Sequence, residues 1–369
     1  MTATLKRLPL HDLHAQAGAH FGHFGEWEVP LYFTSILEEH EAVRSGAGLF
    51  DISHMGEFML WGRDSKNFLD HLLPRRGNRL SDGKALYAPL LNENGGIVDD
   101  LIVYQVRPDQ FLFIVNAANI EKDFAWIRNL VPTQVHLENI SEAKCLYALQ
   151  GPQAILIAQR LFGCDFSGLG YYRFLVLKSS WGEVFISRTG YTGEDGFELM
   201  ADRPQAESLW IALMKEGKKE NLRPVGFGAR DTLRLEVGML LYGQDMDDTT
   251  SAVEAGLEWA VDWEKDHFVG RERNVREKNE GAVRRLVGFE MIERGVPRHG
   301  FEIEKSGRSV GQVTSGSFAP TLKKNIGLGY VPAPEAKAGN EFEIVVRNQK
   351  VKAKIATLPF YKRSNHGIS

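Results

Sequence analysis

The spacing of apolar residues changes character near residue 280, and this change limits the folds open to the chain. Before it, runs of alternating apolar and polar residues, typical of strands, are separated by segments with helical spacing. After it, no helical segment interrupts a series of short strand-like runs with Gly and Pro turns, at residues 285–290, 301–304, 309–317, 325–331, 341–346 and 351–358. We predict that the last part of the chain forms a separate small antiparallel β-barrel.

The first part of the chain predicts an α+β domain. Strands are expected at residues 48–52, 57–61, 100–106 and 110–115, and helices at residues 35–46, 65–73 and 119–130. Ser35 and Glu38 form a capping box that starts the first of these helices. One largely apolar face of this helix carries Ile36, Leu37, His40 and Val43. Strand pairs separated by helices of this length are typical of split β-α-β units with an antiparallel sheet.

The middle of the chain repeats this pattern. Strands near residues 144–149, 172–177 and 184–188, with helices at residues 151–161 and 206–215, predict a second α+β domain. A charged, helix-like segment at residues 270–280 then leads to the barrel. A chain of 369 residues, 43% of them hydrophobic, is long enough to bury the cores of two or three domains.

Charge and hydropathy exclude several classes of partner. The chain has 44 basic and 48 acidic residues and a net charge of −4, so no long-range field favours nucleic acid or anionic lipid. No apolar run approaches the roughly 20 residues of a membrane span. Lys6 and Arg7 are not followed by the apolar core of a signal peptide. We therefore expect no nucleic acid, no membrane and a cytoplasmic location.

Motifs for metals and nucleotides are missing from the sequence. Neither a P-loop nor a strand-bound Gly-x-Gly-x-x-Gly occurs, and no histidine pair has the spacing of a zinc site. His54 lies between apolar neighbours, so a structural role is favoured over a metal or base role. Cys145 and Cys164 are too few for a disulfide framework and are expected to be buried thiols in a reducing compartment.

One motif, at residues 92–101, places two adjacent carboxylates after a Gly-Gly turn. Its sequence is Asn-Glu-Asn-Gly-Gly-Ile-Val-Asp-Asp-Leu. Because side chains alternate along a strand, Asp99 and Asp100 should point to opposite faces, so at most one lies on the buried side. A buried carboxylate needs a partner or a ligand. The alternative is a polar cap at a hairpin turn.

A second motif, at residues 187–199, is rich in glycine and in hydrogen-bonding side chains. Its sequence is Ser-Arg-Thr-Gly-Tyr-Thr-Gly-Glu-Asp-Gly-Phe-Glu-Leu. Such a loop lets the backbone approach a flat ligand closely, while Tyr191 supplies a ring and Glu198 an acceptor. Taken alone, the segment could equally be a long hairpin.

Five motifs in order give the chain a family resemblance. They are Phe-Asp-Ile-Ser-His-Met-Gly at 50–56, Gly-Gly-Ile-Val-Asp-Asp-Leu at 95–101, Gly-Tyr-Thr-Gly-Glu-Asp-Gly-Phe-Glu at 190–198, Gly-Ala-Arg-Asp-Thr-Leu-Arg-Leu-Glu at 228–236 and Val-Thr-Ser-Gly-Ser at 313–317. This set resembles that of the glycine-cleavage T-proteins. The similarity extends from residues 8–14 to residues 358–360, which is nearly the whole chain.

Relatives with the same fold differ in the motif details. These relatives are folate-linked sarcosine and dimethylglycine demethylating modules, sulfoniopropionate demethylases and an iron–sulfur-assembly folate protein. His267 stands where the iron–sulfur relatives carry a diagnostic cysteine, and we expect no flavin domain ahead of this unit. The sequence at residues 75–79, Arg-Arg-Gly-Asn-Arg, departs from the usual T-protein pattern. The resemblance therefore does not extend to a partner contact at this surface.

The resemblance implies an α+β fold of three domains in a cloverleaf arrangement around a central folate site. Two domains would be ferredoxin-like α+β domains and the last an antiparallel β-barrel. Residues 1–54 and 140–265 would form a first, discontinuous domain and residues 55–139 the second. Residues 266–280 would be a linker and residues 281–369 the barrel.

The resemblance also implies the reaction. An aminomethyl group would pass from the dihydrolipoyl arm of lipoylated H-protein to tetrahydrofolate, releasing ammonia and forming 5,10-methylene-tetrahydrofolate, with no metal required. One alternative is a folate-dependent demethylase of a small methylated amine or sulfonium. Another is a folate-binding accessory protein without turnover.

Six residues match family positions at the folate site. Glu198 would accept the N–H edge of the pterin, and Arg230 suits the anionic p-aminobenzoyl-glutamate part. Asp100 is the expected catalytic residue, because its anion would stabilise positive charge developing on nitrogen and could relay a proton. The remaining three would line the same pocket, with aromatic core or turn positions as the alternative: Tyr87, Tyr191 and Asn116.

Overall fold

The computed structural model describes residues 5–363 of the chain, which divide into two compact units. The first unit holds the described residues up to Phe68 together with Asn78–Tyr87 and Leu101–Asp231. The second holds Leu69–Gly77, Ala88–Asp100 and the described residues from Thr232 onward. The domain limits expected from the sequence stay a prediction, and their outermost residues, 1–4 and 364–369, lie outside the described part.

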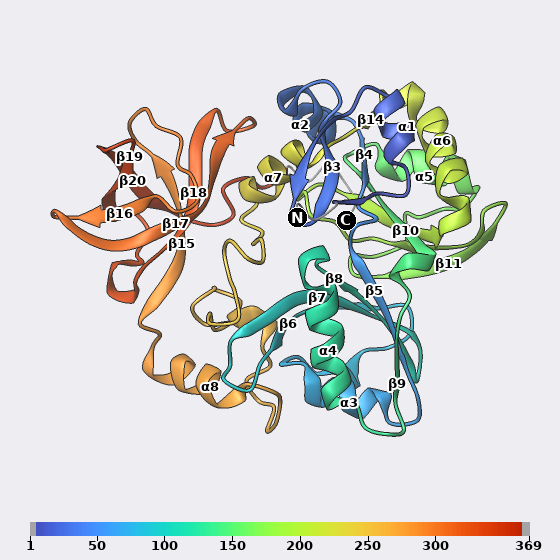
Figure 1. Ribbon diagram of the computed structural model, residues 1–369, viewed down its shortest axis with the longest axis horizontal. Coiled ribbons are helices and arrows are strands. Elements are labelled where there is room, and N and C mark those ends of the chain that lie inside the picture. Colours follow the sequence, from blue (N-terminus) through green and yellow to red (C-terminus); the bar gives the residue numbers. More distant parts are fainter. Residues whose placement is uncertain (1–4, 364–369) are drawn as a thin grey trace. The chain divides into compact units, whose positions relative to one another are not determined.

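A six-stranded sheet forms the larger core of the first unit. Its strands run in the order β11 (Phe174–Ser179), β12 (Gly182–Ser187), β13 (Gly196–Asp202), β10 (Lys144–Gln150), β4 (Gly48–Asp51) and β14 (Arg223–Pro224). Figure 1 shows helices α5 (Ala154–Phe162) and α6 (Ala206–Glu216) side by side near these strands. Their apolar faces share one core with β10 and β13, which includes Ile157, Leu213 and Leu149.

A second sheet has five strands and takes residues from both units. Its order is β6 (Ala85–Leu91), β7 (Ile97–Arg107), β8 (Gln110–Val115), β5 (Gly56–Trp61) and β9 (His136–Asn139). Strands β7, β8, β5 and β9 pair antiparallel, as the sequence predicted for split β-α-β units. The helices between them are α3 (Ser65–Leu72) and α4 (Ile120–Leu130), within a residue or two of their predicted bounds.

Short elements complete the first unit. The chain opens with α1 (His11–Gln16) and a small sheet of β1 (Lys6–Arg7), β3 (Trp27–Tyr32) and β2 (His20–Phe24), none of which the sequence predicted. Helix α2 (Ile36–Ser45) starts where expected, because the Ser35 side chain accepts a hydrogen bond from the Glu38 backbone N–H at 3.2 Å. Single-turn 3-10 helices elsewhere in the chain are Gly77–Arg79, Ala117–Asn119, Ser141–Ala143, Arg203–Gln205, Gly217–Glu220, Glu258–Ala260 and Ala333–Glu335.

The largely apolar face expected for α2 is only partly buried. Ile36 and Leu37 are 39% and 57% exposed, whereas Glu39 is fully buried. The reason is that the Glu39 carboxylate accepts hydrogen bonds from backbone N–H groups, among them Phe33 at 2.6 Å and Gly226 at 2.8 Å. A carboxylate with such partners can lie inside, so the buried side of α2 is formed by Glu39, His40 and Val43.

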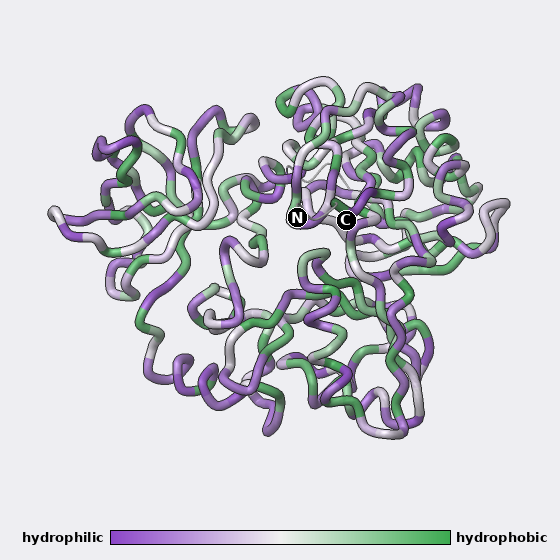
Figure 2. The backbone as a smooth tube through the Cα atoms, in the orientation of Figure 1, coloured by the Kyte–Doolittle hydropathy of each residue, from purple (hydrophilic) through white to green (hydrophobic). Residues whose placement is uncertain are grey.

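The second unit contains the barrel that the sequence predicted. Six antiparallel strands close in the order β15 (Arg284–Met291), β18 (Lys324–Pro332), β17 (Arg308–Ala319), β16 (Glu302–Lys305), β19 (Glu341–Val346) and β20 (Gln349–Ala356). Inward-facing apolar side chains such as Phe289, Ile344 and Ile355 fill it. Helix α7 (Phe227–Glu236) and helix α8 (Arg271–Glu280) precede the barrel, and Figure 2 shows α8 as a strongly hydrophilic segment.

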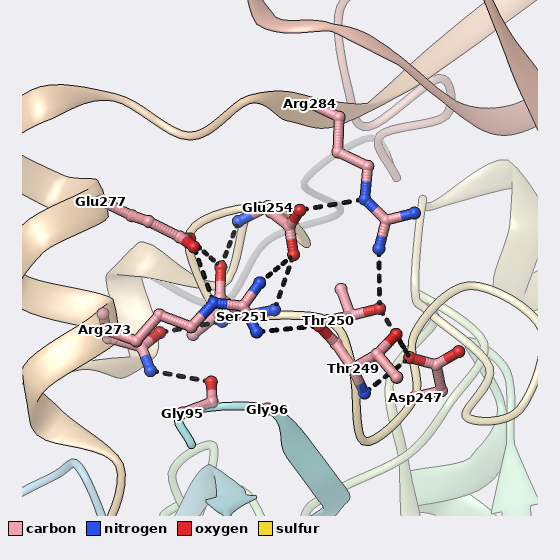
Figure 3. Close-up of polar contacts among 12 residues, drawn as sticks. Gly95, Gly96, Asp247, Thr249, Thr250, Ser251, Glu254, Arg273, Glu277 and Arg284 are labelled. Atoms are coloured by element: carbon pink, nitrogen blue, oxygen red, sulfur yellow. Dashed lines mark hydrogen bonds and ion pairs between the residues drawn. The ribbon is translucent and has the colours of Figure 1, made fainter.

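Charged side chains join α8 to the start of the barrel. Glu254 accepts hydrogen bonds from Arg273 at 2.8 Å, from Arg284 at 2.9 Å and from the Ser251 backbone N–H at 2.9 Å (Figure 3). Arg273 also donates to Glu277 at 2.7 Å, one turn along α8. Because Glu254 is only 7% exposed, these bonds replace the water that its carboxylate loses.

Among the helices of residues 5–363, none is long and apolar enough to cross a membrane.

Glu57 in β5 carries a carboxyl group buried inside the first unit. Its side chain is 2% exposed, and burial raises its pKa from 4.5 to about 8, against the opposing effects of Lys144 and Ser141. Between these two pH values the folded protein therefore keeps a proton on Glu57 that the unfolded chain has released. The resulting stabilisation is fully present below pH 4.5 and is lost as pH rises through about 8.

We predict that Glu57→Gln removes this pH dependence. Between pH 5 and 8 the free energy of unfolding of the wild type should fall by up to about 1.4 kcal/mol per pH unit from this group, so the variant should gain relative stability as pH rises. Thermal midpoints measured across this range test the prediction, with Glu138→Gln on the exposed face of β9 as the control. Parallel pH profiles for the wild type and Glu57→Gln would contradict it.

Candidate functional site

The second sequence motif is a hairpin whose loop lies between β12 and β13. The two strands pair antiparallel, with Ser187 opposite Glu198. Ser187 and Thr189 are buried and two residues apart, so they point to the same side of the chain. The hairpin thus brings two hydroxyl groups next to a carboxylate.

A chain of buried hydroxyl groups ends at Glu198. Thr189 Oγ1 donates to Glu198 Oε2 at 2.5 Å and lies 2.8 Å from Ser187 Oγ and 3.3 Å from the Tyr104 hydroxyl. Within residues 5–363, the other carboxylate oxygen, Oε1, has no hydrogen-bond partner. One oxygen is therefore fixed by the protein, and the second is available to a ligand.

Positive charge lies near this carboxylate. Burial raises the pKa of Glu198, whereas the Thr189 hydrogen bond and the Arg230 charge lower it. The Arg230 guanidinium lies 4.7 Å from the centre of the Tyr191 ring, a cation–π contact between α7 and the hairpin loop. The structure thus brings together three residues of the predicted site: Glu198, Arg230 and Tyr191.

The two remaining pocket candidates lie on the five-stranded sheet. Tyr87 is on β6, and Asn116 directly follows β8, where its carbonyl accepts from the Asn119 N–H at 2.9 Å. Both side chains are half-buried. Strand β7 runs between β6 and β8, so both residues belong to strands that flank it.

Strand β7 carries the two carboxylates of the first motif. Asp99 is fully buried, on the face of Ile97 and Leu101, while Asp100 is half-exposed on the opposite face. This is the alternation that the sequence predicted, and Tyr104, four residues further, shares the face of Asp100. Asp100 itself belongs to the second unit.

His54 lies in an aromatic cluster. Its ring centre is 4.8 Å from that of Phe227, 5.7 Å from Phe24 and 6.4 Å from Trp27. Burial, assisted by the charge of Arg230, lowers the pKa of His54 to about 3, so the imidazole is neutral near pH 7. His54 therefore packs among aromatic rings, one of which, Phe227, is the first residue of α7.

Sequence reasoning missed the residues that support Glu198. Tyr104, Ser187 and Thr189 contribute the hydroxyl chain, and Gln150 of β10 bonds the loop at Thr189. The spacing of Ser187 and Thr189 was a usable signal, because two hydroxyl residues at strand period follow an apolar run. Tyr104 and Gln150 are distant in sequence and gave no such signal.

Among residues 5–363, no group of three or more His, Cys, Asp or Glu side chains is arranged to hold a metal ion. A cavity of about 580 Å³ lies in the second unit, where Asp247, Arg284 and His299 are among its lining residues. None of the predicted site residues lines this cavity.

Comparison with known proteins decides the family. Residues 10–265 match the GCVT N-terminal domain, and residues 284–362 match the glycine cleavage T-protein C-terminal barrel domain. The chain belongs to the glycine cleavage T-protein family.

Full-length relatives agree with this assignment to the T-protein family. The aminomethyltransferase of Desulforamulus reducens is 49% identical over 97% of this chain and 99% of its own length. That of Geobacillus kaustophilus is 48% identical over 98% of this chain and its whole length. The crystal structure of the glycine cleavage system aminomethyltransferase T from Bartonella henselae, 35% identical, superposes with a TM-score of 0.92 over 97% of this chain and 98% of that one. The chain is therefore an aminomethyltransferase that acts in glycine cleavage.

Proposed function

We propose that the chain transfers an aminomethyl group from the dihydrolipoyl arm of lipoylated H-protein to tetrahydrofolate, with release of ammonia. The observation that carries the proposal is the state of Glu198. Its carboxylate has one oxygen held by Thr189 and a second without a partner among the described residues, beside the Arg230 charge. Such a group is arranged to accept the N–H edge of a pterin.

The surroundings of Glu198 fit the rest of a reduced folate. A flat, partly anionic ligand needs an aromatic face and a cation, and Tyr191 and Arg230 supply both in one contact of 4.7 Å. Tyr87 and Asn116 complete the proposed pocket from the strands that flank β7. When bound, tetrahydrofolate supplies the two amine nitrogens that take up the one-carbon unit.

Asp100 is the proposed catalytic residue. Its carboxylate is half-exposed, so it can meet a substrate, whereas Asp99 is fully buried on the core face of β7. Positive charge develops on nitrogen as the one-carbon unit is transferred. A fixed anion stabilises that charge, and the same carboxylate can take up or return a proton.

The proposal also includes the compartment. Cys145 and Cys164 are free thiols, and Cys145 is buried while Cys164 is half-buried. Unpaired cysteines in a chain of this length fit a reducing compartment, which supports a cytoplasmic location for the reaction.

Ammonia release tests the reaction. With aminomethylated H-protein as donor, we expect ammonia to form rapidly only when tetrahydrofolate is present, because the transfer needs its acceptor nitrogens. The same measurement with a small methylated amine in place of H-protein is the control. Release from the amine, or release that ignores tetrahydrofolate, would contradict the proposal.

Substitutions in the proposed pocket should weaken folate binding. Glu198→Gln and Arg230→Ala each remove a charge-assisted contact worth about 1.5–3 kcal/mol, so the dissociation constant should rise by about tenfold or more. Calorimetry with tetrahydrofolate measures the change. Glu183→Gln, an exposed position on β12 of the same hairpin, is the matched control and should bind like the wild type. Wild-type affinity in both pocket variants would refute the assignment.

Asp100→Asn should separate binding from chemistry. The amide keeps the size of the side chain and much of its hydrogen bonding, so folate affinity should change little. Loss of a fixed charge from the reacting centre commonly costs on the order of a hundredfold in rate, so kcat for ammonia release should fall by about that factor. Asp99→Asn should lose much less activity. Equal activity of the two variants, or a more sensitive Asp99, would show that the wrong carboxylate was chosen.

A further inference from the structure

Gln150 ends strand β10 with its side-chain amide buried against the loop that follows β12. The residue is completely buried. Its Nε2 donates to the Thr189 carbonyl oxygen at 3.1 Å, and its Oε1 accepts from Thr192 Oγ1 at 2.8 Å. Both polar atoms of the amide are therefore used, one on each side of Tyr191.

These two hydrogen bonds fix the segment that carries Tyr191. Thr189 and Thr192 bracket Gly190 and Tyr191, so one amide holds the backbone before the ring and a side chain after it. Thr189 is also the residue whose hydroxyl donates to Glu198. Gln150 thus contacts residues that support two proposed folate-binding residues, Tyr191 and Glu198. Among the described residues, no hydrogen bond joins Gln150 to either of these two directly.

The glycines of the loop fit around this amide. A Cβ added to Gly190 would lie 2.0 Å from Gln150 Oε1, and one added to Gly196 would lie 2.4 Å from the Leu149 carbonyl oxygen and 2.7 Å from Gln150 Nε2. Neither glycine has a left-handed φ, so neither is required by its backbone conformation. The space taken by the Gln150 side chain is what excludes a larger residue at position 190.

A separate anchor holds the far side of the loop. Arg44 Nη1 donates to the Thr192 carbonyl at 2.7 Å and to Glu194 Oε1 at 2.9 Å, in a pair whose side chains are 5% and 6% exposed. Arg44 therefore holds the backbone at and after Thr192. Gln150 holds the segment before Thr192, together with the Thr189 hydroxyl contacts and the Arg230 contact to the Tyr191 ring.

We propose that Gln150 is a positioning residue of the folate site, which sets Tyr191 and the Thr189–Glu198 hydrogen bond in the arrangement that binds the pterin part of the ligand. This inference rests on the proposed function of Glu198, Arg230 and Tyr191. An amide is needed because one group must both donate and accept; methionine has a similar volume and does neither strongly.

The test combines binding with turnover. Gln150→Ala should raise the dissociation constant of tetrahydrofolate about tenfold or more, while kcat at saturating folate and KM for H-protein stay within about threefold. Gln150→Met should show the same division, because it fills the space without the hydrogen bonds. Gln159→Ala, which changes a half-buried glutamine on α5 that bonds Asp165, should match the wild type. Equal folate affinity in wild type and Gln150→Met would overturn the proposal.

A double-substitution cycle separates positioning from general loss of stability. Gly190→Ala alone should weaken folate binding by about tenfold or more, because its methyl group would overlap Gln150 Oε1. In the Gln150→Ala background the space is open, so adding Gly190→Ala should cost less than about threefold. If the two effects multiply instead, Gly190 and Gln150 act independently and the proposal is wrong.

Glu198→Gln and Arg230→Ala distinguish a failure of the proposed folate site from a failure of the role proposed for Gln150. If Glu198→Gln and Arg230→Ala bind tetrahydrofolate normally, the proposed site itself is wrong. If those two weaken binding and Gln150→Met does not, the site stands and only the role of Gln150 falls. Thermal midpoints of all variants are measured alongside, and Gln150→Met decides the outcome should Gln150→Ala fail to fold.

Discussion

The partial burial of the Glu198 carboxylate is the constraint on which the rest of the site depends. A carboxylate that has lost part of its water needs hydrogen bonds from the protein, and Thr189 provides one at 2.5 Å. A hydroxyl group has a single proton, so a Thr189 that donates to Glu198 can only accept from Tyr104, and the Tyr104 hydroxyl in turn accepts from Ser187 at 3.2 Å. The negative charge thus orients the whole hydroxyl chain, and any change in the backbone at Thr189 would reach Glu198.

The second unit depends on buried charge in a different way. Arg234 of α7 and Asp245 form an ion pair at 2.8 Å with side chains only 1% and 0% exposed. Asp245 also accepts from Thr314 Oγ1 of β17 at 2.5 Å, and Tyr330 of β18 donates to its backbone carbonyl at 2.7 Å. Removing one partner from such a group would leave an uncompensated charge, so the pair fixes where the chain after α7 meets the barrel.

Much of the fold was predictable because regular strands and helices leave periodic patterns. All six barrel strands and the helices α3, α4 and α6 lie close to the predicted ranges. Elements that lack a pattern were missed: β1 has two residues and β2 includes two histidines and a glycine. The apolar pattern of α2 gave no sign that Glu39 is buried, because its partners are backbone N–H groups from outside its helix. Glu198 could be selected from its motif, whereas its support by Tyr104 needed the tertiary structure.

The glycines of the second motif are required by contacts inside the protein that the sequence does not reveal. From the sequence, Gly190 and Gly196 were interpreted as places where the backbone approaches a ligand. In the structure the missing side chain of Gly190 makes room for Gln150, forty positions earlier, and that of Gly196 makes room for the Leu149 carbonyl oxygen and the Gln150 amide. Gly151, directly after Gln150, is also constrained, since a Cβ there would lie 2.4 Å from the Gly46 carbonyl oxygen. Close packing around the Gln150 amide therefore links positions 150 and 190, and close packing at Gly151 links the end of β10 to the chain at Gly46, although these segments lie far apart in the sequence.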